Sequence, residues 1–373
     1  MLDPIVNFFT WIFQMIGKAI GFVIGIILWP FMWFGRWYMR SGWILKLVFG
    51  AAIVVLIALY GRFIYVTQVW NGFNPNYVDA YTFEKRNISA GEQVNAASGT
   101  DTARTCGRSA IADVSADLIQ FNVNDNAWIS SMILYKLGLF GIDWDHTPFM
   151  DNKASFQRGI NQAVRRTTTE LADNLGRVRT TSQIDADLQD ARGNMQFDEE
   201  TWYFGLQPFG PKTPTPSYYR DAIAKLRSFN DRLEKCQTVF DARADNLKIY
   251  LDRIASDIGS TSALLKDRAE NYNYGFFDPR ADDRFWFAYG QLYAYYGLMK
   301  AAEADFEDVI KQRNLTNLWQ TMDAQFVAAL KIQPWLVANS SETGIFATHL
   351  TTMGFYVLRV RSNMVEISNV LAQ

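Results

Sequence analysis

Few side chains in this chain of 373 residues could bind a metal or act as a nucleophile, because it contains only two histidines and two cysteines. The densest cluster of ligand-type residues is Asp143, Asp145, His146 and Asp151. Carboxylates and imidazoles bind metal ions, but this spacing lacks the glycine and the bidentate glutamate of a calcium loop. A capped turn before the next helix accounts for the same residues. We therefore predict no metal site and no cofactor.

Catalytic motifs are also missing from the sequence: it has no nucleophile elbow, zinc-protease helix, phosphate loop or dinucleotide-binding glycine pattern. Glu199 and Glu200, like Asp282 and Asp283, are adjacent acids, and adjacent residues point apart on a helix. We expect these four to be solvated charges. His349 has no second ligand at metal spacing. The sequence predicts a protein that is not an enzyme, with an envelope hydrolase or sensor as a third hypothesis, because catalytic groups can converge from distant positions.

Cys106 and Cys236 are the two cysteines. In an oxidising compartment they could form one disulfide that closes a long loop. They could equally be two unrelated buried thiols, and the sequence leaves both interpretations open.

An aromatic run, FWFAYGQLYAYYGLM, occupies residues 285–299. Helical spacing places Phe285, Tyr289, Leu292 and Tyr296 on one face. Such a face suits a protein interface or a pocket for an amphiphile. The alternative is that these side chains form the core of a helical bundle.

The elements that would position these groups begin with a segment poor in charge. Residues 1–70 carry five bases and one acid, which gives a net charge of +4. Because the whole chain has a net charge of −2, the remaining residues have a net charge of −6. An acidic remainder argues against a nucleic-acid partner, because binding phosphates requires a basic face. Within this segment, residues 47–67 form a nearly uncharged stretch long enough to cross a bilayer, which predicts a transmembrane anchor.

The segment before the anchor, residues 5–34, is also apolar, and its small and polar residues share one helix face. Glycines at this spacing let another helix approach closely in lipid, so we expect a glycine-zipper face for helix packing. The alternative is an interfacial helix whose polar stripe faces water. Whether residues 5–34 span the bilayer stays open. The face consists of Asn7, Gln14, Gly17, Gly21 and Gly25.

The membrane region divides into an apolar segment, residues 1–35, and a basic linker, residues 36–46. Pro30 predicts a break in the helix near the junction. Arg36, Arg40 and Lys46 place the linker in the cytoplasm by the positive-inside rule. The expected location is therefore a bacterial inner membrane, with the remainder of the chain in the periplasm.

The remainder shows mostly helical periodicity. We expect a linker at residues 68–105 and a helical periplasmic domain at 106–373, with 106–203 and 217–373 as candidate lobes. A heptad-like stripe predicts one long helix over residues 218–258. The predicted fold class is all-α: membrane helices followed by a large extracytoplasmic helical bundle.

The tryptophan-rich apolar N-terminus, the anchor ending near IYVTQVWNGFNP and the long helical remainder resemble one uncharacterised bacterial membrane-anchored family, domain of unknown function twenty-three thirty-three. The resemblance covers nearly the whole chain. It implies a Gram-negative inner-membrane protein, and it supplies no activity or site residues.

Taken together, the sequence predicts a non-enzymatic, membrane-anchored scaffold or accessory subunit of a bacterial envelope complex. Its expected partners are the lipid bilayer and either a second copy or other envelope membrane proteins. The alternative function is a lipid- or small-ligand-binding periplasmic domain tethered to the inner membrane.

Overall fold

The protein is described from a computed structural model, which covers residues 3–83, 90–91, 93–94, 105–139, 141–177, 183–273, 278–340, 344 and 346–373. The chain divides into two compact units, Met1–Phe63 and Ile64–Gln373. The structure is 72% helical with 4% strand, which confirms the all-α class.

The first unit is built from two long helices, α1 (Asp3–Arg40) and the first part of α2 (Trp43–Gln68). The predicted break at Pro30 is wrong, because α1 continues through it. Proline removes one backbone N–H from the helical hydrogen bonds, and the helix continues despite this loss. The turn lies instead at Ser41 and Gly42, so the predicted basic linker is mostly helical.

Of the described helices, α2 is the one long and apolar enough to cross a membrane. Its length of 26 residues matches the roughly 20 residues needed to cross a hydrocarbon core.

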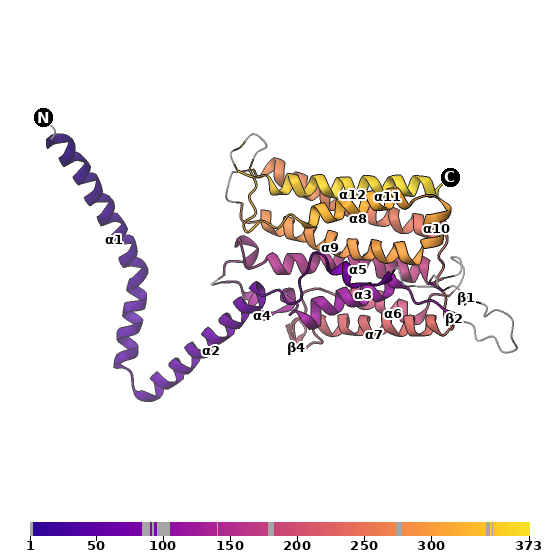
Figure 1. Ribbon diagram of the computed structural model, residues 1–373. Coiled ribbons are helices and arrows are strands. Elements are labelled where there is room, and N and C mark those ends of the chain that lie inside the picture. Colours follow the sequence, from indigo (N-terminus) through magenta and orange to yellow (C-terminus); the bar gives the residue numbers. More distant parts are fainter. Residues whose placement is uncertain are drawn as a thin grey trace. The chain divides into compact units, whose positions relative to one another are not determined.

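The second unit is a bundle of helices with two short antiparallel hairpins, β1 with β2 and β3 with β4 (Figure 1). The strands pair Gln93–Val94 with Thr105–Cys106, and Phe204–Leu206 with Phe209–Pro211. The helices are α3 (Ala110–Gln120), α4 (Ile133–Leu137), α5 (Asn152–Glu170), α6 (Ala186–Met195), α7 (Thr215–Glu234), α8 (Ala244–Asn271), α9 (Ala281–Asp305), α10 (Glu307–Gln312), α11 (Thr316–Leu330) and α12 (His349–Leu371).

Helices α5 and α9 run parallel through the middle of the bundle and touch backbone to backbone. A Cβ on Gly159 would lie 2.1 Å from the Phe287 carbonyl oxygen, and one on Gly290 would lie 2.1 Å from that of Phe156. No side chain fits at such separations. Nearer the start of both helices, Ser155 Oγ donates to Asp283 Oδ1 at 2.7 Å. The two helix N-termini therefore lie at the same end of the bundle.

The apolar core is continuous, and residues from both predicted lobes contribute to it. Part of the predicted linker also packs there: Val78 is buried, and Trp70, Phe73 and Tyr77 lie against the core. These aromatic rings bury a large apolar area. The Asn and Gly residues around them made the average composition of the segment resemble that of a linker. These rings make aromatic contacts with the core, and Tyr77 stacks on Tyr293 with ring centroids 4.4 Å apart.

The single helix predicted over residues 218–258 is wrong. Helix α7 ends at Glu234 and α8 begins at Ala244, with Cys236 in a left-handed conformation (φ 58°) between them. The heptad residues are nevertheless buried on both sides of this break. They are Tyr219, Leu226, Leu233, Phe240, Leu247 and Ile254.

The two ends of the bundle differ in the elements they hold. We call the end where residues 64–68 of α2 meet the start of α5 the α2 end; α4 and β4 lie there (Figure 1). The opposite end, which holds Cys106, Cys236 and α10, is the disulfide end.

Candidate functional site

A buried lysine binds the last turn of α2 at the α2 end. Lys153, in the first turn of α5, is 3% exposed, and its Nζ donates to the Val66 and Val69 carbonyl oxygens at 2.8 and 2.7 Å. The final carbonyls of a helix lack intrahelical partners and carry the negative end of its dipole. An ammonium is therefore well suited to this position. Burial lowers the pKa of Lys153 to about 8.

Three carboxyl groups lie between the N-termini of α5 and α9. Asp151 is 0% exposed and Asp282 is 2% exposed. Nearby backbone amides lower the pKa values of both, but none of the four carboxylate oxygens has a well-formed hydrogen bond within the described part of the chain. Asp283 is partly buried and accepts from Ser155. The prediction that Asp282 is a solvated charge is therefore wrong.

Burial raises the pKa values of Asp151, Asp282 and Asp283. Repulsion from Asp283 raises those of Asp151 and Asp282 further, and repulsion from Asp145 raises that of Asp283. Buried carboxylates without partners favour the neutral form, since a desolvated charge costs more than a desolvated carboxylic acid. The α2 end thus holds a set of acids that can keep protons or accept a cation at neutral pH.

Three of the residues considered as metal ligands lie together in the loop before α5. Asp143, Asp145 and His146 bring one ligand atom each within 4.8 Å of one another. Arg280 occupies this group: its Nη2 lies 2.9 Å from His146 Nε2 and 3.7 Å from Asp145 Oδ2. A guanidinium in that place serves as the counter-charge. Asp151, the fourth candidate, lies apart from them beside Asp282.

The other two adjacent acids, Glu199 and Glu200, form ion pairs rather than standing as solvated charges. Glu199 Oε1 lies 2.8 Å from Arg165 Nη2, and Glu200 Oε1 lies 2.9 Å from Arg158 Nη2. These contacts join the start of the β3–β4 hairpin to α5, which is a structural role.

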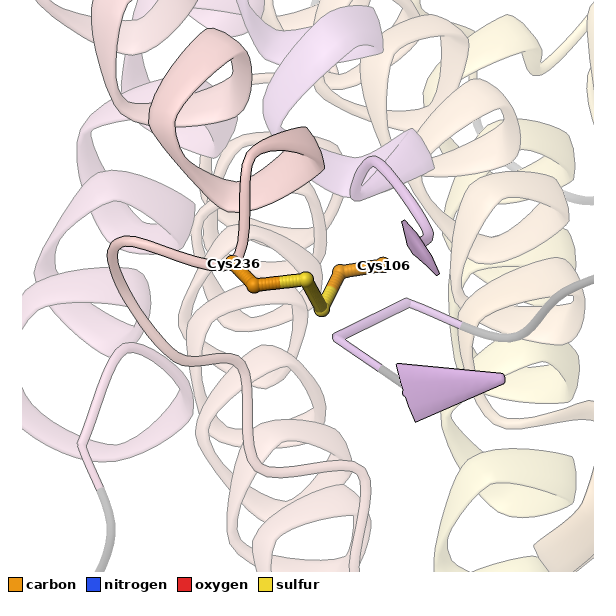
Figure 2. Close-up of a disulfide and its surroundings, with 2 residues drawn as sticks. All are labelled: Cys106 and Cys236. Atoms are coloured by element: carbon orange, nitrogen blue, oxygen red, sulfur yellow. A yellow bond between two sulfur atoms is a disulfide. The ribbon is translucent and has the colours of Figure 1, made fainter. Parts of the chain in front are cut away.

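The disulfide end is closed covalently. Cys106 and Cys236 form a disulfide with a Cα–Cα distance of 5.5 Å (Figure 2). It joins β2 to the turn after α7, over a sequence separation of 130 residues. Beside it, buried Asp305 at the end of α9 accepts hydrogen bonds from the Ala110 and Ile111 amides and from Ser109 Oγ, at 2.7 to 3.0 Å.

A cleft of about 640 Å³ lies along the second half of α9. Tyr81, Phe83 and Tyr296 line it, and so do charged side chains that include Lys300 and Glu303. Lipid pockets are mostly apolar, so this lining suits a small polar ligand better than an acyl chain.

The predicted aromatic face is not on the surface. Phe285, Tyr289, Leu292 and Tyr296 are all buried in the core of the bundle, which is the alternative considered for this run. An amphipathic pattern cannot reveal this, since α9 is apolar all around. Of the four side chains, Tyr296 reaches the cleft.

The predicted glycine face lies on α1, and Gln14 on it is exposed. Added Cβ atoms on Gly17, Gly21 and Gly25 would meet nothing within 4 Å in the described structure. Asn7 lies in the same helix.

Sequence reasoning missed Lys153 and the burial of Asp151 and Asp282. A lysine directed at a helix C-terminus 84 residues away in sequence leaves no local pattern. The sequence did contain one usable signal. Acids in the first turn of a helix are stabilised by the helix N-terminus, and two expected helices begin with such acids.

The fold and this arrangement define a helical protein with one helix suited to crossing a membrane and a disulfide-bonded bundle. The family described as an uncharacterized protein conserved in bacteria, domain of unknown function twenty-three thirty-three, matches residues 43–275 and 279–373. The chain belongs to that family, which confirms the resemblance noted from the sequence. No curated protein and no solved structure matches the chain.

Proposed function

We propose that this protein is a non-enzymatic scaffold or accessory subunit of a bacterial envelope complex, anchored in the membrane by α2. The observation that carries the proposal is the open glycine face of α1. Gly17, Gly21 and Gly25 lie on a long exposed apolar helix and have no neighbour in the described chain. Glycines at this spacing favour close helix packing in lipid, so another helix would supply the missing partner.

The disulfide supports a periplasmic location for the bundle, because disulfides persist in oxidising compartments. The charge pattern agrees, since Arg36, Arg40 and Lys46 precede α2 and favour a cytoplasmic turn. A bundle closed at one end by a disulfide is a durable platform for holding a partner.

The test is the native mass of the full-length protein, extracted in mild detergent from its own cells. Gly21→Leu adds bulk to the open face and should convert a defined multimer or complex into a smaller species. Ile26→Phe is the matched control, because it adds bulk to an exposed position on the opposite side of α1. A Gly21→Leu protein with unchanged mass would refute assembly through this face.

The cleft along α9 supports ligand binding as the second candidate function. Its mixed aromatic and charged lining suits a small polar molecule that bears both a ring and a charge. A lone monomer in the mass measurement would move this candidate to first place.

A further inference from the structure

Six large apolar side chains project into solvent from three separate segments of the second unit. Trp335 is 85% exposed, and Leu206 and Phe209 are each 79% exposed. Scattered single apolar residues are normal on a protein surface, but several at loop tips on one end are not. We call these six the apolar rim: Leu137, Ile142, Phe149, Leu206, Phe209 and Trp335.

Contacts within the second unit place the rim at the α2 end. Gln68 Nε2 donates to the Phe149 carbonyl at 2.9 Å, and the Phe149 and Trp335 rings lie 5.4 Å apart. The Trp144 indole donates to Leu134 of α4, which ties the 142–149 loop to the helix that ends at Leu137.

The β3–β4 hairpin belongs to the same end. Lys136 of α4 lies 3.9 Å from Glu200, just before the hairpin. Leu206 and Phe209 flank the two-residue turn of this hairpin, so they are its outermost apolar side chains. Figure 1 likewise shows β4 and α4 together at one end of the bundle.

The disulfide end has no comparable set. Among residues 105–109, 235–243 and 306–315, all of which the structure describes, Val239 is the one exposed large apolar side chain. The asymmetry coincides with the place where α2 joins the bundle.

We propose that the α2 end of the bundle rests on the membrane surface, with the apolar rim inserted among the lipid headgroups. This inference rests on the membrane anchoring in the proposed function. Helix α2 is continuous to Gln68, and its last residues are already hydrogen-bonded within the bundle, so the span leaves the bilayer beside the rim. There is no intervening linker to hold the bundle away.

The chemistry of the rim fits a lipid interface. Tryptophan and phenylalanine are favoured at the boundary between headgroups and acyl chains. The rim side chains protrude from separate loop tips, whereas a protein partner generally covers one packed patch with an aromatic or arginine anchor at its centre. Insertion at several points around one helix fixes the tilt of the bundle as well as its height.

The experiment uses the full-length protein, with its disulfide intact, in vesicles of phosphatidylcholine and phosphatidylglycerol. Leu206→Cys is labelled with an environment-sensitive fluorophore, and both native cysteines are protected because they are bonded to each other. Gln312→Cys, exposed at the disulfide end, is the matched control. Trp335→Cys provides a second rim probe, should the first variant fold poorly.

A rim probe should emit at shorter wavelength than the control. Lipids with nitroxide-labelled acyl chains should quench it at least about twofold more, as expected for insertion of about 5–10 Å into the interface. Phe355→Cys, on the exposed side of α12, should behave like the control.

Three results would overturn the inference. If a rim probe emits at the same wavelength as the control, the rim is exposed to water and not inserted in the membrane. A blue-shifted probe that nitroxide lipids do not quench shows a protein covering the rim. Protein that fails to float with the vesicles refutes membrane anchoring itself, whereas floating protein with an unquenched rim refutes only this inference.

Discussion

Both ends of the bundle bury aspartates, but the carboxylates are hydrogen-bonded at one end and lack partners at the other. Asp305 at the disulfide end is 0% exposed, and three donors from the start of α3 satisfy its carboxylate. Asp151 and Asp282 at the α2 end are as deeply buried, also beside helix N-termini, but their oxygens have no partner in the described structure. Proximity to a helix N-terminus therefore does not by itself satisfy a carboxylate; the geometry of the amides decides.

The difference separates a stabilised end from an end with unsatisfied groups. The disulfide end has a covalent link and a fully hydrogen-bonded carboxylate, and Arg108 there binds Asp113, Asp231 and Glu234. The α2 end has buried acids without partners, Lys153 of α5 bound to the last turn of α2, and an exposed apolar rim. Groups that cost stability often lie at functional sites, so the α2 end is the better place to test for an interaction.

The largest expected effect tests the covalent closure. Replacing both cysteines, Cys106→Ser with Cys236→Ser, should lower the free energy of unfolding by about 4–5 kcal/mol, because the link closes a loop of 130 residues. The measurement is thermal unfolding of the detergent-solubilised protein.

Reduced wild-type protein should match that double variant. A loss below about 1 kcal/mol would show that the disulfide end depends on its hydrogen bonds rather than on the covalent link.

A smaller effect is expected from the lysine that holds α2. Lys153→Met should destabilise the α2 end by about 2 kcal/mol, because two carbonyls at a helix C-terminus lose a charged donor. Hydrogen exchange should accelerate at residues 64–69 and stay unchanged at the disulfide end.

Lys136→Met is the matched control, since its ammonium makes a long, half-exposed contact with Glu200. Equal acceleration in both variants, or none in either, would remove the special role of Lys153.

The smallest effect has the opposite sign. Asp282→Asn replaces a carboxyl that must keep a proton in order to be buried, and it should raise the free energy of unfolding by about 1–2 kcal/mol near neutral pH. The folded pKa is raised, so the folded protein keeps a proton that the unfolded chain releases near pH 4. Wild-type stability should therefore fall as pH rises from about 4 through neutrality, and the variant should flatten this slope.

Unfolding curves at several pH values in the presence of a chelator measure this effect. The exposed Asp143→Asn on the preceding loop is the control. If a divalent cation stabilises the wild type but not Asp282→Asn, the carboxylates bind metal rather than protons, and the predicted sign is wrong.

Periodicity predicted most of the fold from the sequence. The heptad residues from Tyr219 to Ile254 are buried as expected, and apolar content identified α2. The break after Glu234 escaped prediction because a disulfide and a left-handed cysteine, both tertiary features, interrupt an unbroken apolar stripe. Pro30 caused the opposite error, because its usual effect predicted a break where α1 is continuous.

Little of the candidate site could be predicted. Asp282 and Asp283 look alike in sequence, and only the packing of α5 against α9 decides that Asp282 is buried more deeply. The contact of Lys153 with Val66 depends on where a distant helix ends. By contrast, the glycine spacing on α1 can be read from the sequence alone because it depends on one helix, and its role in helix packing stays a prediction.

The backbone contact between α5 and α9 has a consequence for the history of the family. Gly159 and Gly290 face carbonyl oxygens at distances that no side chain tolerates, so neither can change alone without separating the helices. Two glycines 131 positions apart should therefore persist in lineages whose surfaces have diverged beyond recognition. This pair offers a fingerprint for finding remote descendants of the same ancestor.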